Sequence, residues 1–152
     1  MKKCLALLLV LSMVLTLAAC GGKQPLSVQE FHARVADLGY RQNDDLPQID
    51  YAAWGISQAG YAWKKTGETE IGILLAIFPN SRTKDAALAL LLEDFVSDPG
   101  STASSGSNWE QHRLQNGEEI YVLACVDNTL LVLEALNASD AEVDKVLEAL
   151  GY

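Results

Sequence analysis

Cysteine is scarce in this chain, which has only three among its 152 residues. Cys4 and Cys20 lie in or directly after an N-terminal apolar segment, so Cys125 is alone in the remaining sequence. A single thiol can form neither an internal disulfide nor a cysteine-based metal site. Because Cys125 stands within an apolar run, we expect a small buried residue rather than a reactive thiol.

Histidine is also scarce, and the residue patterns of common active sites are missing. His32 and His112 are the only histidines, and neither has a partner at metal-ligand spacing. The serines of residues 97–108 lack a Gly-x-Ser-x-Gly motif, and there is no glycine-rich phosphate loop. Three aspartates could gather a cation but lack the glycine and closing glutamate of an EF-hand loop: Asp44, Asp45 and Asp50. We therefore expect no catalytic residue, no metal and no cofactor.

Basic residues are few compared with acidic ones. The chain has 11 Lys and Arg against 20 Asp and Glu, for a net charge of −9. The acidic residues are scattered rather than blocked, which is typical of a solvated surface. Since such a chain is repelled by nucleic-acid phosphates, the composition argues against a nucleic-acid partner.

The long apolar run at residues 5–19 is too short to cross a bilayer. A spanning helix needs about 17 to 25 apolar residues. Beyond the run, Gly21, Gly22 and Pro25 cannot extend a helix. A plain transmembrane helix is therefore the weaker interpretation of this segment.

The residues around this run have the anatomy of a signal peptide. Lys2 and Lys3 precede it, and the small residues Ala18 and Ala19 end it. Leu-Ala-Ala-Cys at residues 17–20 resembles the lipobox of bacterial lipoproteins, whereas an ordinary secreted leader needs no cysteine after its cleavage site. The resemblance implies that Cys20 is acylated and holds the chain in the lipid bilayer of the cell membrane, on the extracytoplasmic face.

These features divide the chain into three parts. We expect a signal peptide at residues 1–19, the lipidated cysteine and a tether at residues 20–26, and a single domain at residues 27–152. The last part has the usual size of a domain with one hydrophobic core.

Hydrophobic periodicity predicts an α+β domain with an antiparallel sheet of about five strands packed by three helices, in the order α-β-β-α-β-β-β-α. Ser27 with Glu30, and Ser139 with Glu142, have the form of capping boxes that begin the first and last helices. Leu38-Gly39-Tyr40 and Leu150-Gly151-Tyr152 are expected to end these two helices, with each glycine in the left-handed conformation. A middle helix is expected at residues 81–96, capped by Ser81, with these residues toward the sheet: Ala86, Ala87, Leu90, Leu91 and Phe95. Strands are expected within residues 51–64, at 70–78, and as a meander at 109–114, 119–126 and 129–135. The Ser- and Gly-rich residues 97–108 are expected to form a flexible loop.

The order of elements is similar to that of small uncharacterised lipoproteins of Gram-positive bacteria. The resemblance rests on segments that are not catalytic motifs: residues 17–20, 38–40, 78–87 and 150–152. The alternation of elements is also loosely similar to the PsbP-like α+β fold. Apart from the lipidation of Cys20, neither resemblance implies a site residue or an activity.

Three tryptophans are candidates for a ligand or partner surface. Trp54, Trp63 and Trp109, together with Tyr51 and Tyr61, could line a sugar or peptide surface, because flat rings offer large contact area at low entropic cost. The alternative is that these rings fill the core and the sheet edges. Their positions follow strand alternation, which favours the alternative.

Residues 70–78, 120–126 and 129–133 are apolar on both sides of their strands, whereas a sheet with one wet face would alternate. Either the helices divide between the two faces of the sheet, or they share one face and leave the other as an apolar platform. Exposed platforms of this kind usually mark interaction sites.

The functional interpretation is a membrane-anchored, non-enzymatic binding or accessory module of the cell envelope, with an unknown protein or small-molecule partner. The alternative is a hydrolase acting on envelope material, without a recognisable catalytic motif. The solute receptor of an importer is disfavoured, because a two-lobed receptor needs about twice this length.

Substitution of Cys20 by Ala tests the anchor. We expect Cys20→Ala to abolish lipid attachment and normal processing, because the lipobox resemblance implies that the Cys20 thiol receives the diacylglyceryl group. Metabolic labelling with a radioactive fatty acid, followed by membrane fractionation, measures both. Equal lipid incorporation in the variant and the parent chain would contradict the lipobox interpretation.

Overall fold

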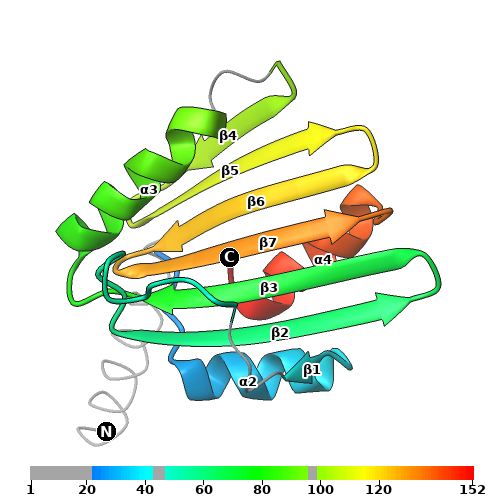
Figure 1. Ribbon diagram of the computed structural model, residues 1–152, viewed down its shortest axis with the longest axis horizontal. Coiled ribbons are helices and arrows are strands. Elements are labelled where there is room, and N and C mark those ends of the chain that lie inside the picture. The colour runs from blue at the N-terminus through cyan, green and yellow to red at the C-terminus, as the bar shows by residue number, and fades with distance from the viewer. Residues whose placement is uncertain (1–21, 43–46, 96–98) are drawn as a thin grey trace, which may run out of the picture.

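The computed structural model describes residues 22–42, 47–95 and 99–152, and for residues 94 and 95 it describes the backbone. The expected signal peptide, Cys20, Asp44, Asp45 and the side chain of Phe95 lie outside this part. Three helices and seven strands form the described chain (Figure 1): α2 (Val28–Asp37), β1 (Arg41–Gln42), β2 (Gln58–Thr66), β3 (Thr69–Ile77), α3 (Ser81–Phe95), β4 (Ser101–Ser105), β5 (Trp109–Asn116), β6 (Glu119–Val126), β7 (Thr129–Leu136) and α4 (Asp140–Leu150).

The strands form one antiparallel sheet in the order β1-β2-β3-β7-β6-β5-β4. The prediction of about five strands in the order α-β-β-α-β-β-β-α is therefore wrong. The two strands that it lacks, β1 and β4, are the edges of the sheet. Edge strands are half solvated and can be short and polar, so their composition gives little strand signal.

The expected loop at residues 97–108 contains the edge strand β4. Ser101–Ser105 pairs with β5 from Ser101 opposite Leu114 to Ser105 opposite Glu110. This ladder satisfies the backbone groups on the side that faces β5, and it does not require apolar side chains. Residues 51–57, expected to begin a strand, instead form turns before β2.

Both predicted capping boxes are confirmed. The Glu30 amide donates to Ser27 Oγ at 3.2 Å, and the Ser27 amide donates to Glu30 Oε2 at 3.0 Å. Ser139 and Glu142 repeat this pattern at the start of α4. Each of these two helices is followed by a glycine with positive φ, Gly39 at 77° and Gly151 at 83°. The turn then folds the next tyrosine back against its own helix.

One face of the sheet is covered by α2 and α4. Its core comprises Phe31 and Val35 from α2, alternate residues of β3, β6 and β7, and the buried stripe of α4. Val143, Val146, Leu147 and Leu150 make that stripe. This face, which we call the first face, holds the larger of the two clusters of buried residues.

The opposite, second face is covered at one end only. There α3 packs on Ala76, Leu123, Cys125 and Leu130, together with Trp54 and Ile56 from the turns before β2. Figure 1 shows α3 over one end of the strands, on the opposite side of the sheet from α4. The helices thus divide between the two faces, and the second face keeps an uncovered end.

The orientation and cap of α3 differ from the prediction. Ala87 and Leu88 are buried, whereas Ala86 is exposed and Leu90 is 57% exposed. Because α3 is apolar on most of its circumference, periodicity alone does not decide which side faces the sheet. Asn80 rather than Ser81 caps the helix, since the Thr83 amide donates to Asn80 Oδ1 at 3.0 Å.

Two leucine substitutions test where the core lies. Leu133 on β7 is fully buried, so we expect Leu133→Ala to lower the free energy of unfolding by about 2 to 5 kcal/mol. Leu90→Ala removes the same atoms from an exposed position and should change it by less than about 0.5 kcal/mol. Urea denaturation measures both values. A similar loss in the two variants would contradict this assignment of the core.

Candidate functional site

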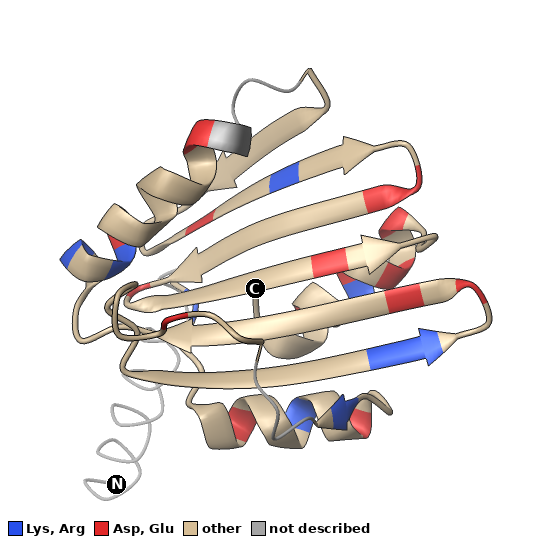
Figure 2. Cartoon of the chain, in the orientation of Figure 1, with Lys and Arg blue, Asp and Glu red and all other residues tan. Residues whose placement is uncertain are grey.

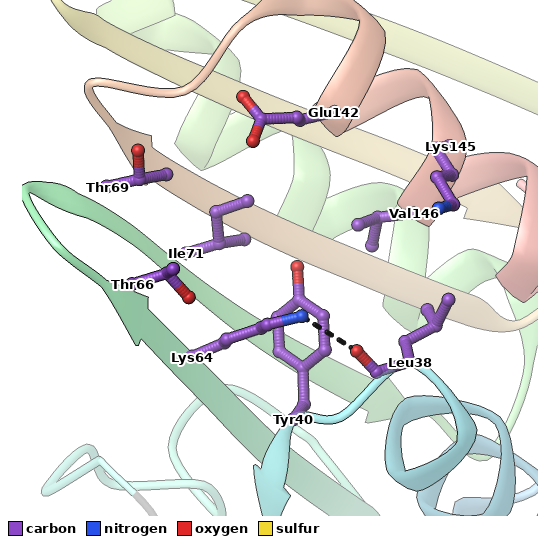
Figure 3. A pocket seen from close by; sticks show the side chains of 9 residues that line it. All are labelled: Leu38, Tyr40, Lys64, Thr66, Thr69, Ile71, Glu142, Lys145 and Val146. Atoms are coloured by element: carbon purple, nitrogen blue, oxygen red, sulfur yellow. Dashed lines mark hydrogen bonds between the residues drawn. The ribbon is translucent and has the colours of Figure 1, made fainter.

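A cleft opens on the first face between the end of α2, the β2–β3 hairpin and α4 (Figure 3). Its volume is about 280 Å³. We call it the Tyr40 cleft. Apolar, hydroxyl-bearing and charged side chains line it: Leu38, Tyr40, Lys64, Thr66, Thr69, Ile71, Glu142, Lys145 and Val146.

Tyr40 is placed in this cleft by the glycine turn that ends α2. Its amide donates to Val35 O at 2.9 Å, and its side chain is only 7% exposed. Figure 3 shows the hydroxyl directed into the cleft. No described residue forms a hydrogen bond with this hydroxyl. Burial, with a smaller contribution from the Glu142 carboxylate, raises the pKa of Tyr40 to about 12, so the hydroxyl is a neutral donor at physiological pH.

Lys64 places an ammonium group beside the Tyr40 ring. Its Nζ donates to Leu38 O at 2.9 Å and lies 5.4 Å from the ring centroid. The ammonium thus satisfies a carbonyl at the end of α2 and keeps further donors for other groups. The Ser139 hydrogen bonds, and to a lesser extent the charge of Lys64, lower the pKa of Glu142. The cleft is therefore charged at neutral pH.

On the second face, the end not covered by α3 is hollowed by two adjoining depressions of about 220 and 340 Å³, which share Tyr61, Gly72 and Glu134. The ring of Tyr61 leans over Gly72, where an added Cβ would lie 3.1 Å from the tyrosine oxygen. We call this area the open surface. It comprises these residues: Tyr61, Gly72, Leu74, Tyr121, Val132, Glu134 and Leu136.

The open surface carries an excess of negative charge. Glu70 and Glu119 lie at its rim, and the Tyr121 hydroxyl donates to Glu119 Oε2 at 3.2 Å. Glu70 pairs with Lys65 at 3.0 Å, whereas Glu119 and Glu134 form no ion pair with any described residue. Burial first, and then the charges of Glu134 and Glu70, raise the pKa of Tyr61. Glu70, Glu119 and Glu134 belong to the neighbouring strands β3, β6 and β7, on which Figure 2 shows acidic positions.

The three tryptophans proposed from the sequence lie in three different places. Trp54 packs against the core under α3, and Trp109 packs against the core of the first face with Lys23 Nζ 4.3 Å from its ring centroid. Trp63 lies on β2 opposite Gly72, with Arg41 stacked at 5.7 Å. Only Trp63 adjoins the open surface, and a ligand role for the three rings stays a prediction.

A further hollow, of about 390 Å³, lies beside Lys84 at the start of α3. The Lys84 side chain is 7% exposed and pairs with Asp85 at 2.6 Å and Glu110 at 3.1 Å. Burial alone lowers the pKa of Lys84, but the bonds to Asp85 and Glu110 outweigh it and raise that pKa above its ordinary value. A charged lysine held by two carboxylates cannot act as a general base for the nearby serines Ser81 and Ser107.

Cys125 and His112 border this network without adding a reactive group. Cys125 is buried and free, as expected from the sequence, and burial raises the pKa of its thiol to about 12. His112 Nε2 lies 3.5 Å from Glu110 Oε2. Throughout the described ranges, no three His, Cys, Asp or Glu side chains converge at metal-binding distance. Within the same ranges, no helix is long and apolar enough to span a membrane.

Comparison with known proteins assigns no family to the chain. No family model matches it, and no curated protein matches it. The extracellular domain of PknH from Mycobacterium tuberculosis is similar in structure, with a TM-score of 0.49 and 12% sequence identity over 85% of this chain and 96% of that domain. This likeness is too weak to carry a functional argument.

Sequence reasoning identified neither the Tyr40 cleft nor the open surface as a site. The sequence pattern predicts only the end of a helix at Leu38, Gly39 and Tyr40, and only a helix cap at Glu142. The sequence contains part of the signal for the open surface, because the residues of strands 70–78 and 129–133 are apolar on both sides and so predict a second face that must be covered. Which end stays open depends on where α3 docks.

Substitutions in the Lys84 network test its structural role. We expect Glu110→Gln to lower the free energy of unfolding by about 1 to 3 kcal/mol, because it leaves a buried ammonium with one charged partner. Lys84→Met should cost less, because the apolar stem is kept and both carboxylates stay partly hydrated. Guanidinium denaturation at pH 7 compares them. The reverse order would contradict the assignment of Lys84 as the buried member.

Proposed function

We propose that this chain is a lipid-anchored extracytoplasmic binding module, and that its open surface binds a basic segment of a partner protein. The observation that carries the proposal is the uncovered end of the second face. It presents two tyrosines and the unpaired carboxylates Glu119 and Glu134 on otherwise apolar strands.

The chemistry of the open surface suits lysine and arginine side chains. Carboxylates and tyrosine faces attract cationic groups, and each such contact gains strength when water is excluded. Leu74 and Val132 offer an apolar floor for the aliphatic stems. Leu136, which is 40% exposed, adds to this apolar area, and Ile49, which is 39% exposed, extends it at the border.

The lipobox supports the location that the proposal assigns. A diacylated Cys20 supplies two chains on one residue, which is sufficient for stable membrane attachment. Residues 20–26 then connect the anchor to α2. The module would present its open surface outside the cytoplasm, where a partner of the cell envelope can reach it.

No observation favours the alternative of an envelope-acting hydrolase. In the described parts of the chain, the hollow beside Lys84 joins serines to a lysine, but that lysine is charged and paired. The thiol of Cys125 is protonated and buried. A binding module accounts for the surface without requiring either group to react.

Charge removal on the open surface tests the proposal. The probe is the peptide acetyl-KLKFK-amide, titrated against the full chain in detergent micelles and followed by backbone amide chemical shifts. We expect shifts at Tyr61, Tyr121 and Val132, and binding that weakens as salt is raised. The double variant Glu119→Gln, Glu134→Gln should weaken binding by about 5- to 30-fold, because it removes both unpaired carboxylates.

A matched variant controls for net charge. Asp37→Asn with Glu148→Gln removes the same charge from the exposed sides of α2 and α4, away from the open surface. It should leave the affinity for the peptide within about twofold, because screened charges at that distance contribute little. Equal weakening in the two double variants would show that net charge alone attracts the peptide and would refute a site at the open surface.

A further inference from the structure

We propose that the Tyr40 cleft is a binding site for a small organic anion, a carboxylate with a short apolar chain. The Tyr40 hydroxyl and the ammonium of Lys64 would hold the carboxylate, with Lys145 adding positive charge at the mouth. The site lies on the first face of the sheet, so it does not depend on the open surface of the second face or on the partner proposed for it.

The first argument is the position of the Tyr40 hydroxyl. The Tyr40 residue is only 7% exposed, and none of the described residues bonds its oxygen. That oxygen is not one of the buried side-chain atoms that lack a partner, so water in the cleft reaches it, and a ligand that accepts a hydrogen bond can replace that water. Figure 3 shows that oxygen directed into the cleft, where a ligand would meet it.

The two Gly-Tyr helix ends provide an internal comparison. Tyr152 follows α4 as Tyr40 follows α2, and both side chains are 7% exposed. The Tyr152 hydroxyl is paired with Thr129 Oγ1 at 2.5 Å. The same Gly-Tyr helix end therefore pairs its tyrosine hydroxyl with a side chain of the protein after α4, and directs that hydroxyl into a cavity after α2.

The second argument is the charge around the cleft. The charged groups that face it are Lys64, Lys145 and Glu142. Glu142 Oε2 is already committed to the cap of α4, where it accepts from the Ser139 amide and hydroxyl, each at 2.8 Å. The cleft is therefore a locally basic site on a chain whose net charge is −9.

The third argument is the lining between the charged groups. Leu38, Ile71 and Val146 give the cleft an apolar wall. Thr66 and Thr69 stand at the hairpin end, where the Thr69 hydroxyl already donates to Asn137 O at 3.0 Å. A site that joins an apolar wall to a cationic corner selects an anion with a short hydrocarbon body rather than a bare inorganic ion.

A series of four-carbon ligands tests the charge that the cleft selects. Butanoate, 1-butanol and 1-aminobutane are titrated into the full chain in detergent micelles, and backbone amide shifts are followed. We expect butanoate to shift Tyr40, Ile71 and Val146 with a dissociation constant on the order of millimolar, as fits so small a ligand. The alcohol and the amine should bind at least about fivefold more weakly.

Three substitutions connect the binding to named groups. Tyr40→Phe should weaken the binding of butanoate by about 5-fold or more. It should not lower the melting temperature, because the Tyr40 hydroxyl bonds no described residue. Tyr152→Phe should lower the melting temperature, because the Tyr152 hydroxyl is paired with Thr129. Lys64→Met should weaken butanoate by a similar factor, and Lys145→Met, at an exposed position, by about twofold or more. Lys65→Met is the matched control, because Lys65 follows Lys64 but points to the opposite face and should leave binding unchanged.

Several outcomes would overturn the proposal. Absence of cleft shifts with butanoate would refute the site, and tighter binding of 1-aminobutane would refute its anionic ligand. A drop in melting temperature for Tyr40→Phe as large as that for Tyr152→Phe would show that the hydroxyl has a structural partner. Lys64 also bonds Leu38 O, so Lys64→Met can fail to fold. In that case, unchanged butanoate binding in both Lys145→Met and Tyr40→Phe would refute the proposal.

Discussion

The apolar character of β3, β7 and β6 on both faces is the constraint on which this structure depends. β7 pairs with β3 on one side and β6 on the other, along eight residue pairs each. Side chains from all three strands are buried on the first face and again on the second. A sheet of this kind cannot leave either whole face to water, so the helices are divided between the faces.

The division is unequal, and both candidate sites arise from it. Two helices with buried stripes cover the first face, and a single helix with the turns of residues 51–57 covers part of the second. The single helix cannot reach the hairpin end of the strands, which leaves Tyr61, Tyr121 and their neighbours as the open surface (Figure 1). On the first face, α2 and α4 leave the Tyr40 cleft between them and the β2–β3 hairpin.

Helix termini supply most of the polar groups of that cleft. The Gly39 turn orients Tyr40, the carbonyl of Leu38 positions Lys64, and the cap of α4 fixes Glu142. Each of these groups satisfies a local requirement of a helix end, and each also lines the cavity. The interactions that stabilise the helix ends thus also position the polar groups of the cleft, so no further set of residues is needed to hold them in place.

The sequence by itself determined the features that depend on neighbouring residues: the capping boxes at Ser27 and Ser139, the Gly39 and Gly151 turns, the meander of β5, β6 and β7, and the burial of Cys125. The chemistry of a cap or a tight turn is complete within a few residues, so the pattern is sufficient. Only the tertiary structure decided the edge strands β1 and β4, because a polar edge strand is stabilised by the backbone of its neighbour rather than by its own side chains. It also decided that Lys84 rather than Leu90 faces the sheet, that Trp54, Trp63 and Trp109 lie apart, and that Tyr40 meets Lys64 and Glu142. Those outcomes depend on which elements pack together, and contacts between distant segments leave no period in the sequence.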